Sequence, residues 1–381
     1  MLAIINSDNY LSVNTLLLTC ITIDRSMTTE MIETFLSKPF PLLTMINCRY
    51  TGINSIPTIQ SLTSIDCRGC INLTSIPVLH NLEKLNCSRC VGITSIPTLT
   101  NLTSLDFSDS PNINNIPGDL YNLTSLECSG CAISSIPILP GLTNIYCSEC
   151  DNITSIPELP NLRYLDFSES INITSIPILN SLKKLSLSGC SNITSIPMLP
   201  NITSLNCSRC DGLTRIPILP NLTRLDCSAC SNITSIQGLD DLTELYCNEC
   251  PNLNSISELP RLSKLYCSSC GNLNSISELP NLTLLDCRIC SNLTSIPVFP
   301  YITSLNSSYC NRLKVHTIPL KFLDLSALSN DVIYQAIEHN SLNLEYIQMY
   351  LNATKSCKED KREFLEYIIH NSILVKSALK R

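Results

Sequence analysis

The residues with the most evident chemistry are the cysteines. The chain of 381 residues contains 23 of them, and nine pairs have the spacing Cys-x-x-Cys. Two neighbouring pairs of this kind are a zinc signature, because four thiolates supply the tetrahedral sulfur ligands that structural zinc sites use. The nine pairs are Cys67/Cys70, Cys87/Cys90, Cys128/Cys131, Cys147/Cys150, Cys207/Cys210, Cys227/Cys230, Cys247/Cys250, Cys267/Cys270 and Cys287/Cys290.

Substitutions within the chain itself favour a different role for these positions. The first cysteine position is also occupied by Phe107, Phe167 and Leu187, and the second by Ser110 and Ser170. A position that accepts Phe is a buried apolar slot and not a ligand, and free Cys often behaves as a small buried hydrophobe. We therefore expect two core columns of reduced thiols, with zinc sites and disulfides between stacked strands as the alternatives.

A short internal repeat places these cysteines. Its common form is N-L-T-S-L-D-C-S-x-C-x-N-I-T-S-I-P-x-L-P, and it runs from Leu43 to about Leu328 in fourteen to fifteen units. One unit gains a residue around Gly118, and the next loses one around Ala132, which restores the phase. An internal repeat of this length indicates a solenoid, in which stacked units bury a continuous core.

Each unit is predicted to contain one strand and one extended return arm. Leu225, Asp226 and Cys227 alternate between apolar and polar, which is the period of a half-buried strand. Proline follows the second isoleucine of most units, and proline fixes φ and removes a backbone donor, so this arm must be extended or polyproline-like. The prediction is a parallel β-sheet on one face with thin return arms on the other.

The apolar pattern L-x-x-L-x-C-x-x-C, as in Leu222 to Cys230, resembles that of leucine-rich repeats. The 20-residue length and the I-P-x-L-P arm resemble the YopM/IpaH-type repeats of bacterial effectors, over about three quarters of the chain. The composition also resembles leucine-rich-repeat proteins of amoeba-infecting giant viruses. These resemblances imply a horseshoe or superhelix with an interaction surface. Some bacterial relatives carry a ubiquitin-ligase domain with a catalytic Cys, but only about fifty residues follow the repeats here, with Cys357 as their one cysteine.

The strand face carries the candidate binding residues. The outward position after each buried leucine varies while the core columns stay constant, as expected of a surface that packing does not restrict. Tyrosines on a rigid sheet suit a role as interface anchors, although Tyr also simply favours strands. The candidate partner-binding residues are Tyr146, Tyr164, Asp166, Asp226, Tyr246, Tyr266 and Asp286.

The two ends differ from the repeats. Residues 1–42 are expected to form an N-terminal capping segment, with a strand at Leu16 to Asp24 and a helix at Thr28 to Ser37 capped by Thr28 or Thr29. An F-box is the alternative, but the segment is short for that three-helix module. Residues 43–328 form the leucine-rich-repeat solenoid. Residues 329–381 show helical periodicity and are expected to form a helical C-terminal segment that covers the last coil.

Composition and motifs exclude several function classes. The net charge of −7 and the pI near 5.2 argue against nucleic acid, which needs clustered Lys and Arg. The four histidines are scattered, and we find no catalytic, metal or cofactor motif, so the chain is not expected to be an enzyme. No apolar run is long enough to span a membrane, and no clear signal peptide is visible.

These observations predict a monomeric, non-catalytic scaffold that binds a protein on its strand face. The alternative is an adaptor that brings a target to a ubiquitin ligase through its terminal segments. Recurrent N-x-S/T sequences would mean glycosylation in a secreted protein, but their Asn residues occupy fixed turn positions where a side-chain amide satisfies backbone groups. We therefore expect a reducing intracellular location, with the cytoplasm of a host cell as one such place.

Overall fold

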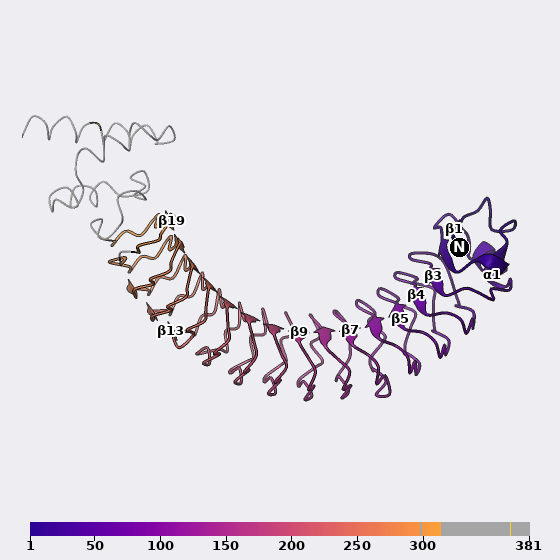
Figure 1. Ribbon diagram of the computed structural model, residues 1–381, viewed down its shortest axis with the longest axis horizontal. Coiled ribbons are helices and arrows are strands. Elements are labelled where there is room, and N and C mark those ends of the chain that lie inside the picture. Colours follow the sequence, from indigo (N-terminus) through magenta and orange to yellow (C-terminus); the bar gives the residue numbers. More distant parts are fainter. Residues whose placement is uncertain (298, 314–365, 367–381) are drawn as a thin grey trace, which may run out of the picture. The chain divides into compact units, whose positions relative to one another are not determined.

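The computed structural model describes residues 1–297, 299–313 and 366. The chain divides into two compact units, Met1–Asn206 and Cys207–Arg381, and the described repeats of each form a stack of parallel coils. In both units the strands line one side of the coils and the return arms line the other (Figure 1). The C-terminal segment predicted to be helical lies outside the described residues, except for Glu366.

Parallel strands of the first unit pair in sequence order, each with the next. Leu105 pairs with Leu126, and Leu126 pairs with Ile145, so a coil that is longer than its neighbours is followed by one that is shorter. The gain near Gly118 and the loss near Ala132 therefore leave the strand register intact, as predicted. The strands are β1 (Leu2–Ile5), β2 (Cys20–Ile23), β3 (Met45–Asn47), β4 (Ser64–Asp66), β5 (Lys84–Asn86), β6 (Ser104–Asp106), β7 (Ser125–Glu127), β8 (Asn144–Tyr146), β9 (Tyr164–Asp166), β10 (Lys184–Ser186) and β11 (Ser204–Asn206).

The N-terminal segment contributes to the same ladder, because β1 pairs with β2 and β2 pairs with β3. A 3-10 turn, η1 (Thr15–Leu17), precedes β2, so the predicted strand starts later than expected. The predicted helix is confirmed as α1 (Thr29–Leu36). Its N-cap is Thr28, whose hydroxyl accepts a hydrogen bond from the Met31 amide at 3.3 Å.

The second unit carries two parallel sets of strands. On the strand side they are β12 (Arg224–Asp226), β14 (Glu244–Tyr246), β16 (Lys264–Tyr266), β18 (Leu284–Asp286) and β19 (Ser304–Asn306). On the return-arm side, three short strands form a second sheet, which the sequence analysis did not anticipate: β13 (Ser235–Ile236), β15 (Ser255–Ile256) and β17 (Ser275–Ile276).

The core of each coil consists of the predicted apolar columns. In one coil these are Leu222, Leu225, Cys227, Cys230, Ile233 and Ile236, each with no exposed surface. Phe107 and Phe167, which replace cysteine in the first column, are equally buried. No disulfide joins the 22 cysteines among the described residues, and all except Cys20 are buried.

The second cysteine column has a polar role that the apolar interpretation missed. Its thiols donate hydrogen bonds to the backbone carbonyl of the first-column residue in the preceding coil, as from Cys270 to Cys247 at 3.0 Å. Ser110 makes the equivalent bond to the Cys87 carbonyl at 3.0 Å, which explains why Ser can replace Cys here. Burial raises the pKa of the Cys131 thiol to about 12, so this thiol keeps the proton it donates.

Asparagine and threonine side chains connect neighbouring coils at the surface. The amide of Asn101 donates to the His80 carbonyl at 2.8 Å, and that of Asn232 donates to the Asp211 carbonyl at 2.7 Å. The hydroxyl of Thr103 donates to the Glu83 carbonyl at 3.0 Å. The predicted role of the recurrent Asn residues in satisfying backbone groups is thus confirmed at these positions.

A left-handed residue ends the turn between the two cysteine columns. In the repeats, the third residue after the end of the strand, such as Arg89 after β5, has a φ of about +56° to +77°. Most of these residues are not glycine. Where glycine does occur, close packing accompanies it: a Cβ on Gly69 would overlap the Tyr50 ring of the preceding coil. The turn therefore imposes its backbone conformation on whichever residue is present.

Candidate functional site

The strand face presents its outward residues in columns, because parallel in-register strands place equivalent side chains next to each other. Every three-residue strand except β19 buries its middle residue and leaves the first and third residues at least partly exposed, as in Glu244, Leu245 and Tyr246. All seven predicted contact residues occupy such outward positions. They form two groups, one in each unit.

The first group lies on β8 and β9. The rings of Tyr146 and Tyr164 are in contact, with centroids 4.7 Å apart and planes tilted by 35°. Asp166 pairs in register with Tyr146 and accepts hydrogen bonds from the amide and hydroxyl of Ser168, at 2.9 and 2.6 Å. Partial burial raises the pKa of the Tyr164 hydroxyl, and the nearby Asp166 carboxylate adds to this. This group therefore combines an aromatic surface with a fixed carboxylate.

The second group crosses four consecutive strands of the second unit. Asp226, Tyr246, Tyr266 and Asp286 follow one another in register on β12, β14, β16 and β18. The two tyrosine rings are stacked, with centroids 4.7 Å apart and an angle of only 4° between their planes. An aromatic pair with an aspartate on each side is thus built into one column of the face.

Charged residues of the neighbouring column lie beside this aromatic pair. The Arg224 guanidinium lies 5.2 Å from the centroid of the Tyr246 ring, within the range of a cation–π contact. Glu244 accepts a hydrogen bond from the Lys264 ammonium at 2.7 Å and lies 3.8 Å from Arg224. The hydrogen bond from Lys264 lowers the pKa of the Glu244 carboxyl, so Glu244 is ionised at neutral pH. The sequence analysis missed these three residues because it considered mainly the position after each buried leucine.

Three glutamates lie beside the strand face and not on it. Glu149, Glu169 and Glu249 occupy the left-handed turn position that follows the strands, with φ values of 56°, 58° and 56°. Asp286 is engaged by Arg288, whose Nε and Nη2 atoms donate to its two oxygens at 2.9 Å each. Asp286 therefore offers less free negative charge than the sequence suggests.

The described residues contain neither a cluster of metal-ligating side chains nor a membrane-spanning helix. In residues 1–297 and 299–313 we find no group of three or more His, Cys, Asp or Glu side chains arranged to hold a metal ion. No helix within these ranges is both long and apolar enough to cross a bilayer.

Comparison with solved structures identifies the repeat type. The chain is similar to YopM, a leucine-rich effector protein from Yersinia pestis, with 25% identity and a TM-score of 0.52, over 71% of this chain and 84% of that one. This chain is a leucine-rich-repeat protein with repeats of about 20 residues. The leucine-rich-repeat fold is generally a protein-interaction module and is typically non-catalytic.

Two further matches have lower scores. The functional domain of InlJ from Listeria monocytogenes, described as including a cysteine ladder, has 21% identity and a TM-score of 0.46 over 78% of this chain. This leucine-rich-repeat chain spans 62% of the length of that domain. A leucine-rich-repeat protein from Bacteroides ovatus has 16% identity and a TM-score of 0.42, over 71% of this chain and 78% of that one.

No protein-family model and no curated protein matches the chain. The solved structures named above come from bacteria, and they give no support to the resemblance to giant-virus proteins.

Proposed function

We propose that this leucine-rich-repeat protein is a non-catalytic scaffold that binds a protein partner on its strand face. The observation that carries the proposal is the stacked pair of Tyr246 and Tyr266, with Arg224 over the Tyr246 ring and ion pairs from Glu244 to Arg224 and Lys264 beside it. Interface anchors are enriched in Tyr and Arg, and an anchor that is already ordered loses little entropy on binding. The Tyr146 and Tyr164 pair provides a second anchor point in the first unit.

The aspartates on either side define the proposed contact surface further. Asp226 and Asp286 border the second tyrosine pair, and Asp166 borders the first. Carboxylates at the rim of an aromatic patch contribute mainly to specificity and association rate, because rim charges remain hydrated. We therefore assign the aromatic rings to affinity and the aspartates to selection of the partner.

A double substitution tests this function directly. Replacing Tyr246 and Tyr266 by Ala should weaken partner binding by roughly 30-fold or more, since a hot-spot residue contributes about 2 kcal/mol. Surface substitutions usually change stability by about 0.5 kcal/mol or less, so the melting temperature should hardly move. Binding is measured by affinity capture with the purified chain from extracts, followed by titration of the recovered protein.

The matched control replaces Tyr121 and Tyr301, which are each 64% exposed and lie outside the strands. This control should bind the partner like the unchanged chain. Undiminished binding by the Tyr246/Tyr266 variant would contradict the proposal. Recovery of ubiquitin-ligase subunits that survives the double substitution would instead favour an adaptor that acts through its terminal segments.

We propose a reducing intracellular location, which the buried thiols support. Second-column thiols such as that of Cys270 are buried, and Cys270 donates its proton to the Cys247 carbonyl. Thiol labelling of the denatured chain without reductant should count close to the 23 cysteines of the sequence. Stoichiometric zinc, or a majority of blocked thiols, would contradict this expectation.

A further inference from the structure

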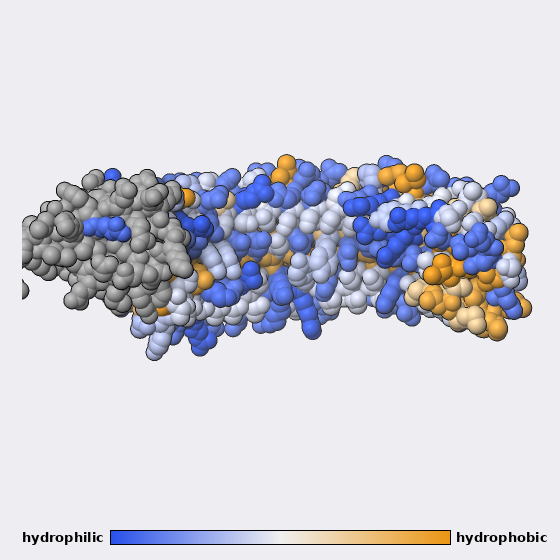
Figure 2. All heavy atoms as spheres, turned by 90° about the horizontal axis from the view of Figure 1, so that it is seen from above, coloured by the Kyte–Doolittle hydropathy of each residue, from blue (hydrophilic) through white to orange (hydrophobic). Residues whose placement is uncertain are grey.

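Exposed apolar side chains gather at the N-terminal end of the first unit, where Figure 2 shows a concentration of hydrophobic atoms. We call six of these residues the N-terminal apolar patch; each exposes between 42% and 66% of its surface. Together they present on the order of 600 Å² of apolar surface, close to what one partner contributes to a standard protein interface. The patch comprises Leu2, Ile4, Leu16, Leu17, Leu42 and Met45.

The fold itself does not require apolar residues at these positions. Leu17 and Leu42 precede the first buried leucine of their coils, a position that most later coils fill with asparagine. Those asparagines donate side-chain hydrogen bonds to the preceding coil, as from Asn81 to the Gln60 carbonyl at 2.8 Å. Two coils have thus replaced a stabilising polar contact by an exposed leucine. This exchange indicates a surface that becomes covered.

The backbone at the same end also lacks a partner. β1 is the first strand in the sheet order and pairs only with β2, so its other edge has no neighbouring strand among the described residues. One outward backbone group is already satisfied, because the side-chain amide of Asn9 donates to the Ile4 carbonyl at 3.0 Å. Soluble proteins usually protect such edges with charged residues, proline or bulges, but β1 has the sequence Leu-Ala-Ile-Ile.

We propose that the N-terminal apolar patch and the free edge of β1 form a self-association surface that binds the same surface of a second copy of this chain. An edge strand is satisfied by another edge strand, and a second copy supplies one together with a matching apolar area. None of the six patch residues is charged, whereas the whole chain carries a net charge of −7. The patch residues themselves therefore bring no like charges together. The proposed dimer differs from the monomer expected from the sequence.

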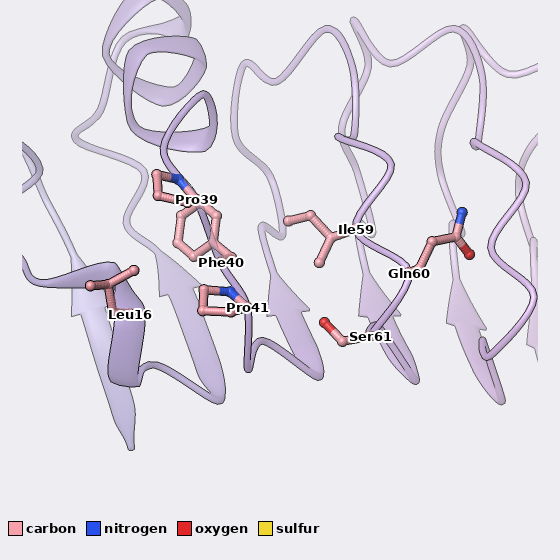
Figure 3. Close-up of a pocket in the computed structure, with 7 residues that line it drawn as sticks. All are labelled: Leu16, Pro39, Phe40, Pro41, Ile59, Gln60 and Ser61. Atoms are coloured by element: carbon pink, nitrogen blue, oxygen red, sulfur yellow. The ribbon is translucent and has the colours of Figure 1, made fainter.

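An open pocket beside the patch provides a place for an apolar side chain of the second copy. It has a volume of about 610 Å³, and Leu16, Pro39, Phe40, Pro41 and Ile59 form its apolar walls (Figure 3). Leu16 belongs to both the pocket and the patch. The surface thus offers a strand edge, an apolar area and a recess in one region, while the two tyrosine pairs of the proposed partner site lie elsewhere on the chain.

The mass of the full chain in solution tests this inference. Sedimentation equilibrium across about 1 to 100 µM, which covers dissociation constants near the micromolar value of a modest interface, should show twice the 42.1 kDa of one chain. Leu17→Asn with Leu42→Asn introduces the residue common in this column and should weaken the dimer at least about tenfold. The control, Ile178→Asn with Ile218→Asn, changes two return-arm residues that are 61% and 62% exposed and should leave the dimer intact.

A second variant addresses the strand edge. Ile4→Lys places a charge on the exposed strand β1 without altering the core. This variant should sediment with the mass of a single chain, and its circular dichroism should be unchanged. A single-chain mass for the unchanged protein at the highest concentration would overturn the inference and leave the patch to a partner of other chemistry. Dimers that persist in both patch variants would overturn it as well, and neither result depends on the tyrosine pairs.

Discussion

The return arms of the chain differ at one position, and their backbone structure changes with it. Arms that carry proline after the second isoleucine, such as those of Pro157 and Pro197, form no strand within the described residues. Three arms carry Gln237, Ser257 or Ser277 at that position, and these arms form β13, β15 and β17. The Ser257 amide donates to the Ile236 carbonyl at 3.1 Å, a bond that proline cannot make.

This difference separates two ways of holding a solenoid together. The strand side has a backbone ladder in every described coil, whereas most return arms depend on buried side-chain columns and on side-chain bonds between coils. The apolar pattern is the same in both kinds of arm. Sheet formation on this side is therefore limited by the supply of backbone donors and not by hydrophobicity. Substitutions on the two sides should consequently have very different effects.

The largest effect is expected in the core columns that every coil shares. Cys227→Asp places a carboxylate where no surface is exposed, and should destabilise the fold by about 3 kcal/mol or more. Cys227→Ala removes only the sulfur and should cost about 1 kcal/mol. Urea denaturation followed by circular dichroism measures both. Similar, negligible shifts for the two variants would mean that this column faces solvent.

A smaller effect is expected from the donor role of the second cysteine column. Cys270→Ala removes the donor to the Cys247 carbonyl and should cost about 1 to 3 kcal/mol, because a buried acceptor is left unsatisfied. Cys270→Ser keeps a donor of the kind that Ser110 and Ser170 already supply, and should cost about 1 kcal/mol or less. Thermal melting compares the variants. If Ser proves as costly as Ala, packing and not hydrogen bonding determines this column.

The smallest effect is expected on the return-arm side. Ser257→Pro removes the bond to the Ile236 carbonyl and should cost about 1 to 1.5 kcal/mol, because the loss of a bonded amide outweighs the entropy that proline removes from the unfolded chain. Hydrogen exchange should become faster at Ser277, the next amide of this small sheet. A stability loss as large as that of Cys227→Asp would show that the second sheet is essential, and would invalidate the distinction between the two sides.

Much of the architecture could be predicted because the repeats differ from one another, and these differences show which residues and lengths each position accepts. Phe107 in a cysteine column indicated burial, and the compensating length changes near Gly118 and Ala132 indicated an unbroken register; the structure confirms both. The thiol hydrogen bonds could not be predicted from apolar patterning, since they depend on which carbonyl each side chain reaches. One feature of the sequence does indicate the left-handed turn: Gly69, Gly130 and Gly189 occupy the same position of their repeats.

The candidate site was predictable in its members but not in its structure. Tyr246 and Tyr266 occupy the same position of adjacent repeats, so their stacking follows from register alone. The roles of Arg224, Glu244 and Lys264 depend on side-chain conformations that spacing does not determine.

The compensated length change near Gly118 has an evolutionary consequence. The added residue lies in a return arm, and the strands on both sides of it remain paired residue for residue. Insertions and deletions can therefore accumulate in the arms while the strand face is inherited unchanged. Duplication of one complete unit would lengthen that face by about 4.8 Å, the spacing of adjacent strands. Lineages can thus vary the reach of the surface and the chemistry of its individual columns independently.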